Sequence, residues 1–321
     1  MSITAIYQLP VPIWISTDVL GERIRSGYRG FEFDVFMPTD IAPVGGAPVV
    51  PCVEVPAVES DADLVVWAVE FAAEASDPNS TALCRVVVQT LESHDPVNGP
   101  SDLARAMERW FDAVRTWAET LTGQDLDPNH RVFSSKEYGE HLTLLDPAPA
   151  TNGPIALSLS IPHVVPVSAS EWRMLLARVA AGEEPPLEEQ LNRDARAAFN
   201  REQYRRSVID AASAAEIVLH RLIATSVTEA QLPNSEYRRR LLKLDMQPLG
   251  DLVKIADAAG VDVEVDGLAA LVRVRNDAIH RGAAPSIFDA YQAGKAATRL
   301  LGCYGEWKRA GSAATSGASG T

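Results

Sequence analysis

The sequence predicts an α+β fold, in which an antiparallel sheet with a packed helix is followed by an all-helical bundle. Three observations carry this prediction. The first 60 residues alternate short apolar runs with turn-forming residues, residues 101–121 repeat apolar side chains at helical spacing, and everything from Leu187 onward has helical periodicity. At 321 residues the chain is also long enough for two domains.

The expected strands of the first part are short. ITAIY (residues 3–7) and FEFDVFMP (31–38) precede a Pro- and Gly-rich stretch that excludes regular helix. Residues 63–75 and 81–91 flank the polar turn SDPNS and predict an antiparallel hairpin, although 63–75 also fits a helix. Three further short strands are expected near Arg131, near Leu142 and at Ile155–Ile161.

Residues 101–121 form the clearest helix of this part. Apolar residues spaced 4, 3, 4, 3 and 4 apart line one face: Leu103, Met107, Trp110, Val114, Trp117 and Leu121. Ser101 is the expected N-cap and Gly123 the expected end. We interpret the two tryptophans as core packing against the sheet rather than as a ligand pocket.

The character of the chain changes after residue 165. Ser168 and Glu171 have capping-box spacing, and the helix they start is predicted to end before Gly182. The expected organisation is an α+β domain of unread role, sensory or regulatory (1–165), a helix and linker (166–186), a helical domain (187–309) and a tail of disordered composition (310–321).

The helical domain is expected to be a four- to five-helix bundle, although six of its segments have helical signals. Its predicted segments are 187–200, 203–226, 235–245, 248–259, 268–282 and 286–308. Alanines in the second segment permit close helix approach. The last segment starts with the capping pair Ser286 and Asp289, and its expected packing face comprises Phe288, Tyr291, Leu301 and Tyr304.

Charge and composition exclude some classes of function. The net charge is −14, with 26 acidic against 11 basic residues in 1–186 and 17 against 18 in 187–321. Coating of nucleic acid by the whole molecule is therefore disfavoured, while a local RNA contact in the second part is allowed. We expect no metal or cofactor, because the three cysteines are scattered and no two histidines have the spacing of a metal-binding pair. The sequence predicts no membrane span and a cytoplasmic location.

The most informative stretch is Leu268–Gly282, LAALVRVRNDAIHRG. It combines a core face with three polar side chains, Arg275, Asn276 and His280. Asn276 and His280 lie one turn apart on one face, whereas Arg275 points roughly 140° away from His280 on a straight helix. Either the helix loosens near Gly282 or a second copy of the motif completes the site.

This R-N-x-x-x-H motif resembles the R-x4-6-H signature of HEPN domains, some of which are metal-independent endoribonucleases of toxin–antitoxin and antiphage systems. The helix from Tyr204 to Glu216 resembles the first long helix of that bundle, so the resemblance covers residues 187–309. It implies a homodimer, RNA as substrate, and an inhibitory partner protein or effector ligand. Gly282 departs from the pattern, because many such toxins carry a modifiable tyrosine two residues after the histidine.

The resemblance also implies residue roles. His280 would be the general acid and base, since imidazole titrates near neutral pH, and Arg275 would hold the phosphate. Asn276 would either orient the imidazole or bond the scissile phosphate. Supporting roles are expected for Glu216, Arg273 and Arg281, and RNA backbone contact for Arg238, Arg239 and Arg240. The alternatives are a helix-end histidine with a surface arginine, a Glu216 that pairs with Arg273 or Arg275, and a solvated triple-arginine face. At the level of the protein they are a non-catalytic HEPN-like module that binds RNA or a nucleotide or that dimerises, and a helical scaffold for the N-terminal domain.

Overall fold

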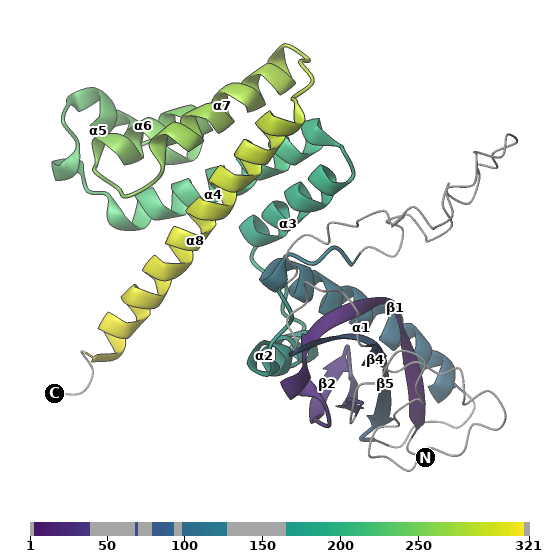
Figure 1. The fold of residues 1–321 in the computed structure, drawn as a ribbon. Coiled ribbons are helices and arrows are strands. Elements are labelled where there is room, and N and C mark those ends of the chain that lie inside the picture. The colour runs from purple at the N-terminus through teal and green to yellow at the C-terminus, as the bar shows by residue number, and fades with distance from the viewer. Residues whose placement is uncertain (1–2, 39–67, 70–78, 93–97, 127–164, 318–321) are drawn as a thin grey trace, which may run out of the picture. The chain divides into compact units, whose positions relative to one another are not determined.

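The computed structural model divides the chain into two compact units, Met1–Glu184 and Pro185–Thr321 (Figure 1). It describes residues 3–38, 68–69, 79–92, 98–126 and 165–317. The α+β fold class is confirmed, with an antiparallel sheet first and helices after it.

The first unit is an antiparallel sheet covered by two helices. Its strands are β1 (Thr4–Ser16), β2 (Arg23–Tyr28), β3 (Phe31–Phe36), β4 (Ala68–Val69) and β5 (Ser80–Thr90), in the order β1-β5-β3-β2 with β4 also paired to β5. A 3-10 turn, η1 (Thr17–Val19), follows β1. Helices α1 (Gly99–Thr122) and α2 (Ala169–Ala180) pack on this sheet.

The predicted hairpin is partly present. Ala68 pairs with Leu83 and Val69 with Ala82 in antiparallel register. The remainder of 63–75, and the strands predicted near Arg131, near Leu142 and at Ile155–Ile161, lie outside the described residues.

Two successive buried hydrogen bonds connect helices α1 and α2 to the sheet. The Trp110 indole donates to Ser26 Oγ at 2.9 Å, and the Ser26 hydroxyl donates to the carbonyl of Leu176 at 3.2 Å. Trp110 and Trp117 are both buried, which confirms their interpretation as core. Because Trp172 and Leu176 are buried in the same core, α2 belongs to the N-terminal unit and is not a linker.

Three helix ends test the predicted caps. The prediction for Ser101 is wrong: α1 starts at Gly99, two residues earlier, because Pro100 fits the first turn of a helix, where its missing N–H costs nothing. Gly123 ends α1 as predicted, with φ of 76°. The Ser168–Glu171 capping box is also confirmed.

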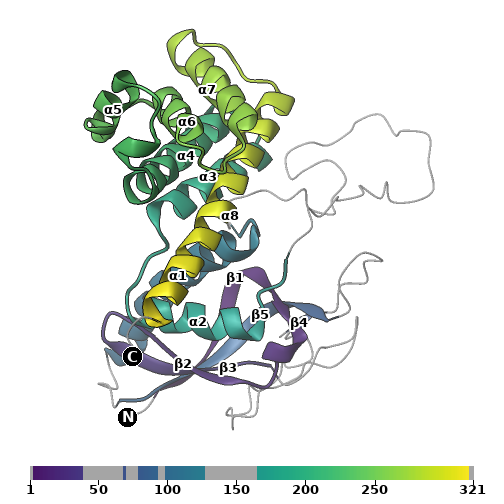
Figure 2. The ribbon, with the colours of Figure 1, turned by 90° about the vertical axis from the view of Figure 1, so that its left-hand side faces the viewer.

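The second unit is built around a central helix. Its helices are α3 (Leu187–Asn200), α4 (Tyr204–Ser226), α5 (Ser235–Leu241), α6 (Leu249–Ala258), α7 (Val265–His280) and α8 (Ile287–Gly317), with 3-10 turns η3 (Glu229–Gln231) and η4 (Leu244–Met246). Helix α4 packs against α3, α6, α7 and α8, as the two views of Figures 1 and 2 show. Its alanines Ala211, Ala212, Ala214 and Ala215 are buried, so the neighbouring helices approach closely.

Helix α8 is longer than expected. It continues to Gly317, so the prediction of a disordered tail is wrong for residues 310–317, while 318–321 lie outside the described part. Extending an existing helix through an alanine-containing segment avoids the cost of nucleation, which composition alone does not reveal. In the described ranges, none of the helices combines the length and the apolar character that crossing a lipid bilayer requires.

The two serines give a matched test of helix capping. Ser168 accepts a hydrogen bond from the Glu171 amide, whereas Ser101 lies exposed inside the first turn of α1. Ser168→Ala should lower the free energy of unfolding by about 1 kcal/mol, and Ser101→Ala should change it by less than about 0.5 kcal/mol. Urea unfolding of both variants measures this difference, and equal losses would contradict the assignment of the caps.

Tyr7 predicts a pH dependence of stability. Burial, with the nearby carboxylates of Glu108 and Asp112, raises the pKa of Tyr7 to about 12. An unfolded tyrosine ionises near pH 10, so between pH 10 and 12 the native state keeps a proton that the unfolded state has released. This contribution is fully present below pH 10 and is lost as the pH rises towards 12. Urea unfolding at pH 9 and pH 11 should therefore show a larger loss of stability for the wild type than for Tyr7→Phe.

Candidate functional site

Helix α7 positions the three motif residues through its buried face. Leu268, Leu271, Val274 and Ala278 of α7 are buried in the bundle. The side chains between them must turn outward, so Arg275 is half-buried and Asn276 and His280 are exposed. The core contacts of α7 therefore fix the directions of all three.

Arg275 and Asn276 meet at the edge of a groove. The Arg275 guanidinium donates to Asn276 Oδ1 at 3.1 Å. Both residues line a groove of about 390 Å³ between α6 and α7, whose walls include Val253, Val272 and Lys254. The remaining guanidinium N–H groups stay available for a ligand, which suits the phosphate-binding role predicted for Arg275.

The helix does not loosen before His280. Residue 280 is the last of α7, and the Asp277 carbonyl accepts from the amides of Arg281 and Ala283, each at 3.1 Å. The reversal of direction comes only at Gly282, with φ of 67°. The loosening of the helix end that would bring Arg275 and His280 together within one chain is therefore absent.

Arg275 and His280 accordingly do not meet within one chain. His280 does not line the groove that holds Arg275 and Asn276. Its imidazole is exposed and forms no hydrogen bond or ion pair with any described residue. One copy therefore offers an imidazole on one side of the helix end and a guanidinium on another.

The predicted supporting residues are not gathered around the motif. Glu216 is half-buried on α4 but forms no ion pair with Arg273 or Arg275, all three being described residues. Arg275 turns to Asn276 instead. Hydrogen bonds from Ser286, and then the charge of Arg273, lower the pKa of Asp289, which places Arg273 towards the start of α8.

Arg281 is held by an acidic neighbour. Its guanidinium forms an ion pair with Asp277 at 3.0 Å, one turn back along the chain. The side chain is otherwise exposed, so this pair is screened by solvent and can exchange for a phosphate.

The triple-arginine run is mostly engaged within the bundle. Arg240 forms ion pairs with Asp251 at 2.9 Å and Glu236 at 2.5 Å, and it lies over the Tyr237 ring. Arg238 donates to the Leu232 carbonyl at 3.4 Å. Only Arg239 is exposed without such a contact in the described chain, so two of the three arginines are engaged and RNA contact by the run stays a prediction.

Sequence reasoning missed the contact of another histidine, His220. His220 Nε2 lies 2.8 Å from Asp245 Oδ1, which connects α4 to η4. No spacing rule relates residues 25 positions apart. Among the described residues there is no group of three or more His, Cys, Asp or Glu side chains placed to hold a metal ion, and Cys84 and Cys303 are free thiols.

The predicted packing face of α8 is wrong in its first two residues. Phe288 and Tyr291 are exposed, whereas Tyr304 is buried and Leu301 half-buried. The face that enters the bundle consists of Ala290, Ala293, Ala297 and Leu300. The alanines of α8 recur at helical spacing and could have indicated its buried face. The prediction chose the large aromatic residues instead, because large apolar side chains are usually buried.

Comparisons of the chain with protein-family models, with curated proteins and with solved structures find no match. A function for this chain therefore rests on its own residues and their geometry.

Proposed function

We propose that the C-terminal unit is a HEPN-like, metal-independent endoribonuclease whose site is completed when two copies of the chain meet. The observation that carries this is the end of α7. An exposed His280 follows Asn276 by one turn, and Asn276 is hydrogen-bonded to an Arg275 that faces a groove. One side of the motif offers proton transfer and the other offers phosphate binding.

The proposed reaction uses the 2′-hydroxyl of RNA as nucleophile. His280 takes the 2′-hydroxyl proton, the oxygen attacks phosphorus, and the bond from phosphorus to the 5′-oxygen breaks. The departing oxygen receives a proton from imidazolium, leaving a 2′,3′-cyclic phosphate and a 5′-hydroxyl. Arg275 of the other copy stabilises the charge that develops on the phosphoryl oxygens.

A second candidate is supported by the divergence of Arg275 and His280. If copies do not bring these groups together, Arg275 and Asn276 still offer a phosphate-binding edge without proton transfer. The unit would then be an RNA-binding or dimerisation module. The cell biology also follows from the resemblance: we propose a stress or antiphage effector that a partner or ligand restrains, with the N-terminal unit as sensor.

Cleavage of RNA should depend on both His280 and Arg275. In a chelator-containing buffer, wild type should cut single-stranded RNA to 2′,3′-cyclic ends, and His280→Ala should be at least about a hundredfold slower because general acid–base catalysis is lost. Arg275→Lys should fall between wild type and Arg275→Ala, since lysine keeps the charge but not the bidentate geometry.

His220→Ala is the matched control. It removes a histidine of the same unit that pairs with Asp245 on another element. It should leave cleavage unchanged, while circular dichroism verifies that all variants remain folded. Wild type that cuts no RNA, but binds it, would favour the second candidate.

A mixed dimer of two inactive variants tests whether two copies share the site. Arg275→Ala and His280→Ala chains, each inactive alone, are co-expressed with different tags and purified as the mixed dimer. That dimer holds one intact Arg275–His280 pair across the interface, so it should recover about half of the wild-type rate. No recovery, or a protein that sediments as a monomer at working concentration, would contradict a site made by two copies.

A further inference from the structure

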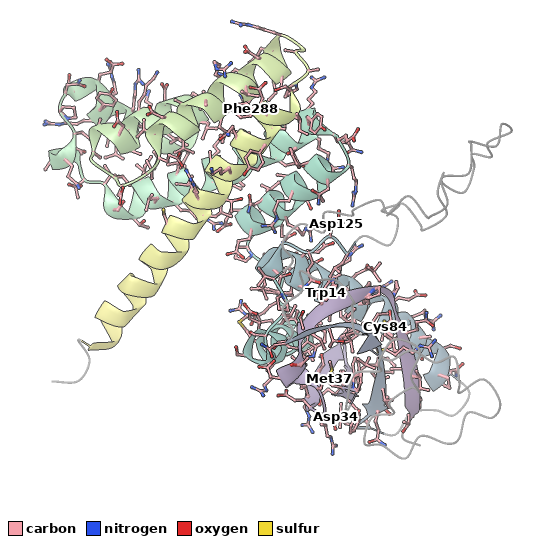
Figure 3. All side chains as sticks on the ribbon, viewed as in Figure 1. Trp14, Asp34, Met37, Cys84, Asp125 and Phe288 are labelled. Carbon is pink, nitrogen blue, oxygen red and sulfur yellow. The ribbon has the colours of Figure 1, made fainter. Side chains whose placement is uncertain are left out.

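A row of aromatic rings lies where α3, α4 and α8 come together. The ring centroids of Phe199 and Tyr204 are 5.7 Å apart, and those of Phe199 and Tyr291 are 6.4 Å apart. Phe288, labelled in Figure 3 on the first turn of α8, is 66% exposed, and Tyr291 is 53% exposed. Large rings left in solvent on one surface are typical of a binding site rather than of packing.

A groove continues this row. It has a volume of about 540 Å³, and Tyr204 belongs to both the row and the groove. Its other walls are the start of α4 and the loop after α7: Glu202, Gln203, Arg205, Arg206, Ile209, Ala284 and Pro285. We call the groove together with Phe199, Tyr204, Phe288 and Tyr291 the aromatic platform.

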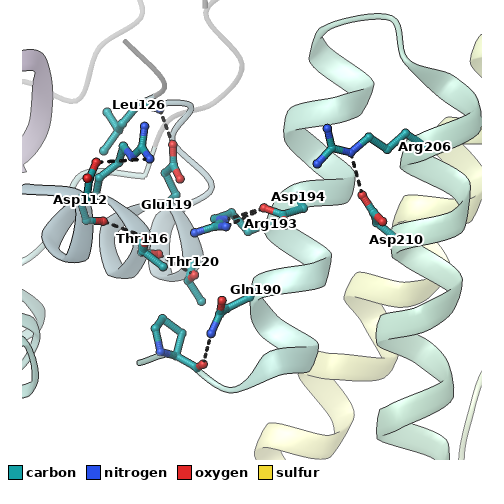
Figure 4. A network of polar contacts seen from close by, with 12 residues as sticks. Asp112, Thr116, Glu119, Thr120, Leu126, Gln190, Arg193, Asp194, Arg206 and Asp210 are labelled. Carbon is teal, nitrogen blue, oxygen red and sulfur yellow. Dashed lines mark hydrogen bonds and ion pairs between the residues drawn. The ribbon is translucent and has the colours of Figure 1, made fainter. Parts of the chain in front are cut away.

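The platform carries cations without partners. Arg205 lines the groove, is exposed, and has no ion pair or hydrogen bond in the described chain. Lys295, one turn after Tyr291 and two after Phe288, is likewise exposed and unpaired among the described residues. Arg206, in contrast, is held by Asp210 at 3.4 Å (Figure 4), and Glu202 is the acidic residue of the groove.

We propose that the aromatic platform binds an unpaired RNA strand, with bases stacked on Phe288 and Tyr291 and phosphates at Arg205 and Lys295. Stacking on exposed rings requires bases whose faces are free, and in a duplex these faces are covered by neighbouring bases. Because every base has such a face, stacking does not select a sequence. The free cations complement a polyanion. A second copy fits less well, because two-fold contact through this surface would bring unpaired cations towards each other.

The platform adjoins the motif along the chain. Ala284 and Pro285 line the groove and follow His280 by four and five residues, so the connecting backbone spans at most about 18 Å. A strand held in the groove can therefore extend to the end of α7. The choice of RNA as the ligand rests on the proposed function. The platform adds that the RNA substrate is single-stranded.

Binding is tested on the full chain with the His280→Ala substitution, which prevents cutting. Fluorescence anisotropy follows a labelled oligouridine of about 12 nucleotides. Phe288→Ala/Tyr291→Ala should weaken binding at least about tenfold. Phe288→Leu/Tyr291→Leu should weaken it similarly, and Phe288→Tyr/Tyr291→Phe should retain it, because only rings stack. Arg205→Ala should make the plot of log affinity against log salt concentration less steep, by about the slope that one phosphate contact contributes.

Leu242→Ala/Met246→Ala is the matched control, since these side chains are also exposed and apolar. Leu242 follows α5 and Met246 belongs to η4, and neither element contributes to the platform. It should bind like the parent chain. The proposal would be overturned if the alanine pair bound RNA as tightly as the parent chain, or if the leucine pair kept full affinity. A preference for duplex RNA would overturn it as well. A shift of the monomer–dimer equilibrium with unchanged RNA affinity would assign the surface to a second copy instead. RNA that binds through the platform but is never cut by wild type would refute the nuclease alone.

Discussion

The close packing of α4 is the constraint on which the C-terminal unit depends. Its buried alanines present almost no side chain, so the helices around it approach closely and leave little freedom to rotate. Core side chains of α7 must then point at the bundle, and the residues between them are left half-buried, like Arg275, or exposed, like Asn276 and His280. Tight burial of apolar residues on one side is thus what places an imidazole and an amide in solvent on the other.

The same constraint separates the motif. With Leu271, Val274 and Ala278 turned inward, Arg275 falls beside the α6–α7 groove, and His280 falls outside it at the helix end. Regular hydrogen bonding to the Asp277 carbonyl keeps the last turn intact, so no local unwinding brings the two together. A helix cannot place residues five positions apart on one atom, whereas a two-fold related helix end can supply the missing group from outside.

Local signals predicted much of the fold. The Ser168–Glu171 box, the glycine at 123, the tryptophan stripe of α1 and the bounds of α3 all depend on residues within one or two turns, where stereochemistry decides. Predictions about contacts between elements far apart in the sequence were less successful. Glu216 was given an arginine partner that instead turns to Asn276, and α2 was separated from the sheet that buries it. Phe288 and Tyr291 were assigned to the core because periodicity identifies a face without telling whether alanine or aromatic residues pack there.

The charge of the chain restricts where a polyanion such as RNA can bind. With 26 acidic against 11 basic residues, the sequence up to residue 186 repels RNA, and the near-neutral remainder cannot attract it by net charge either. The proposed RNA binding must then come from a few cations that no carboxylate neutralises, combined with stacking, which does not depend on charge. Arg205 and Lys295 beside exposed aromatic rings provide both, whereas Arg240 and Arg206 are already engaged by Asp251 and Asp210. An affinity of this proposed kind would depend on stacking more than on phosphate contacts, so it would persist at salt concentrations that release RNA from a purely basic surface.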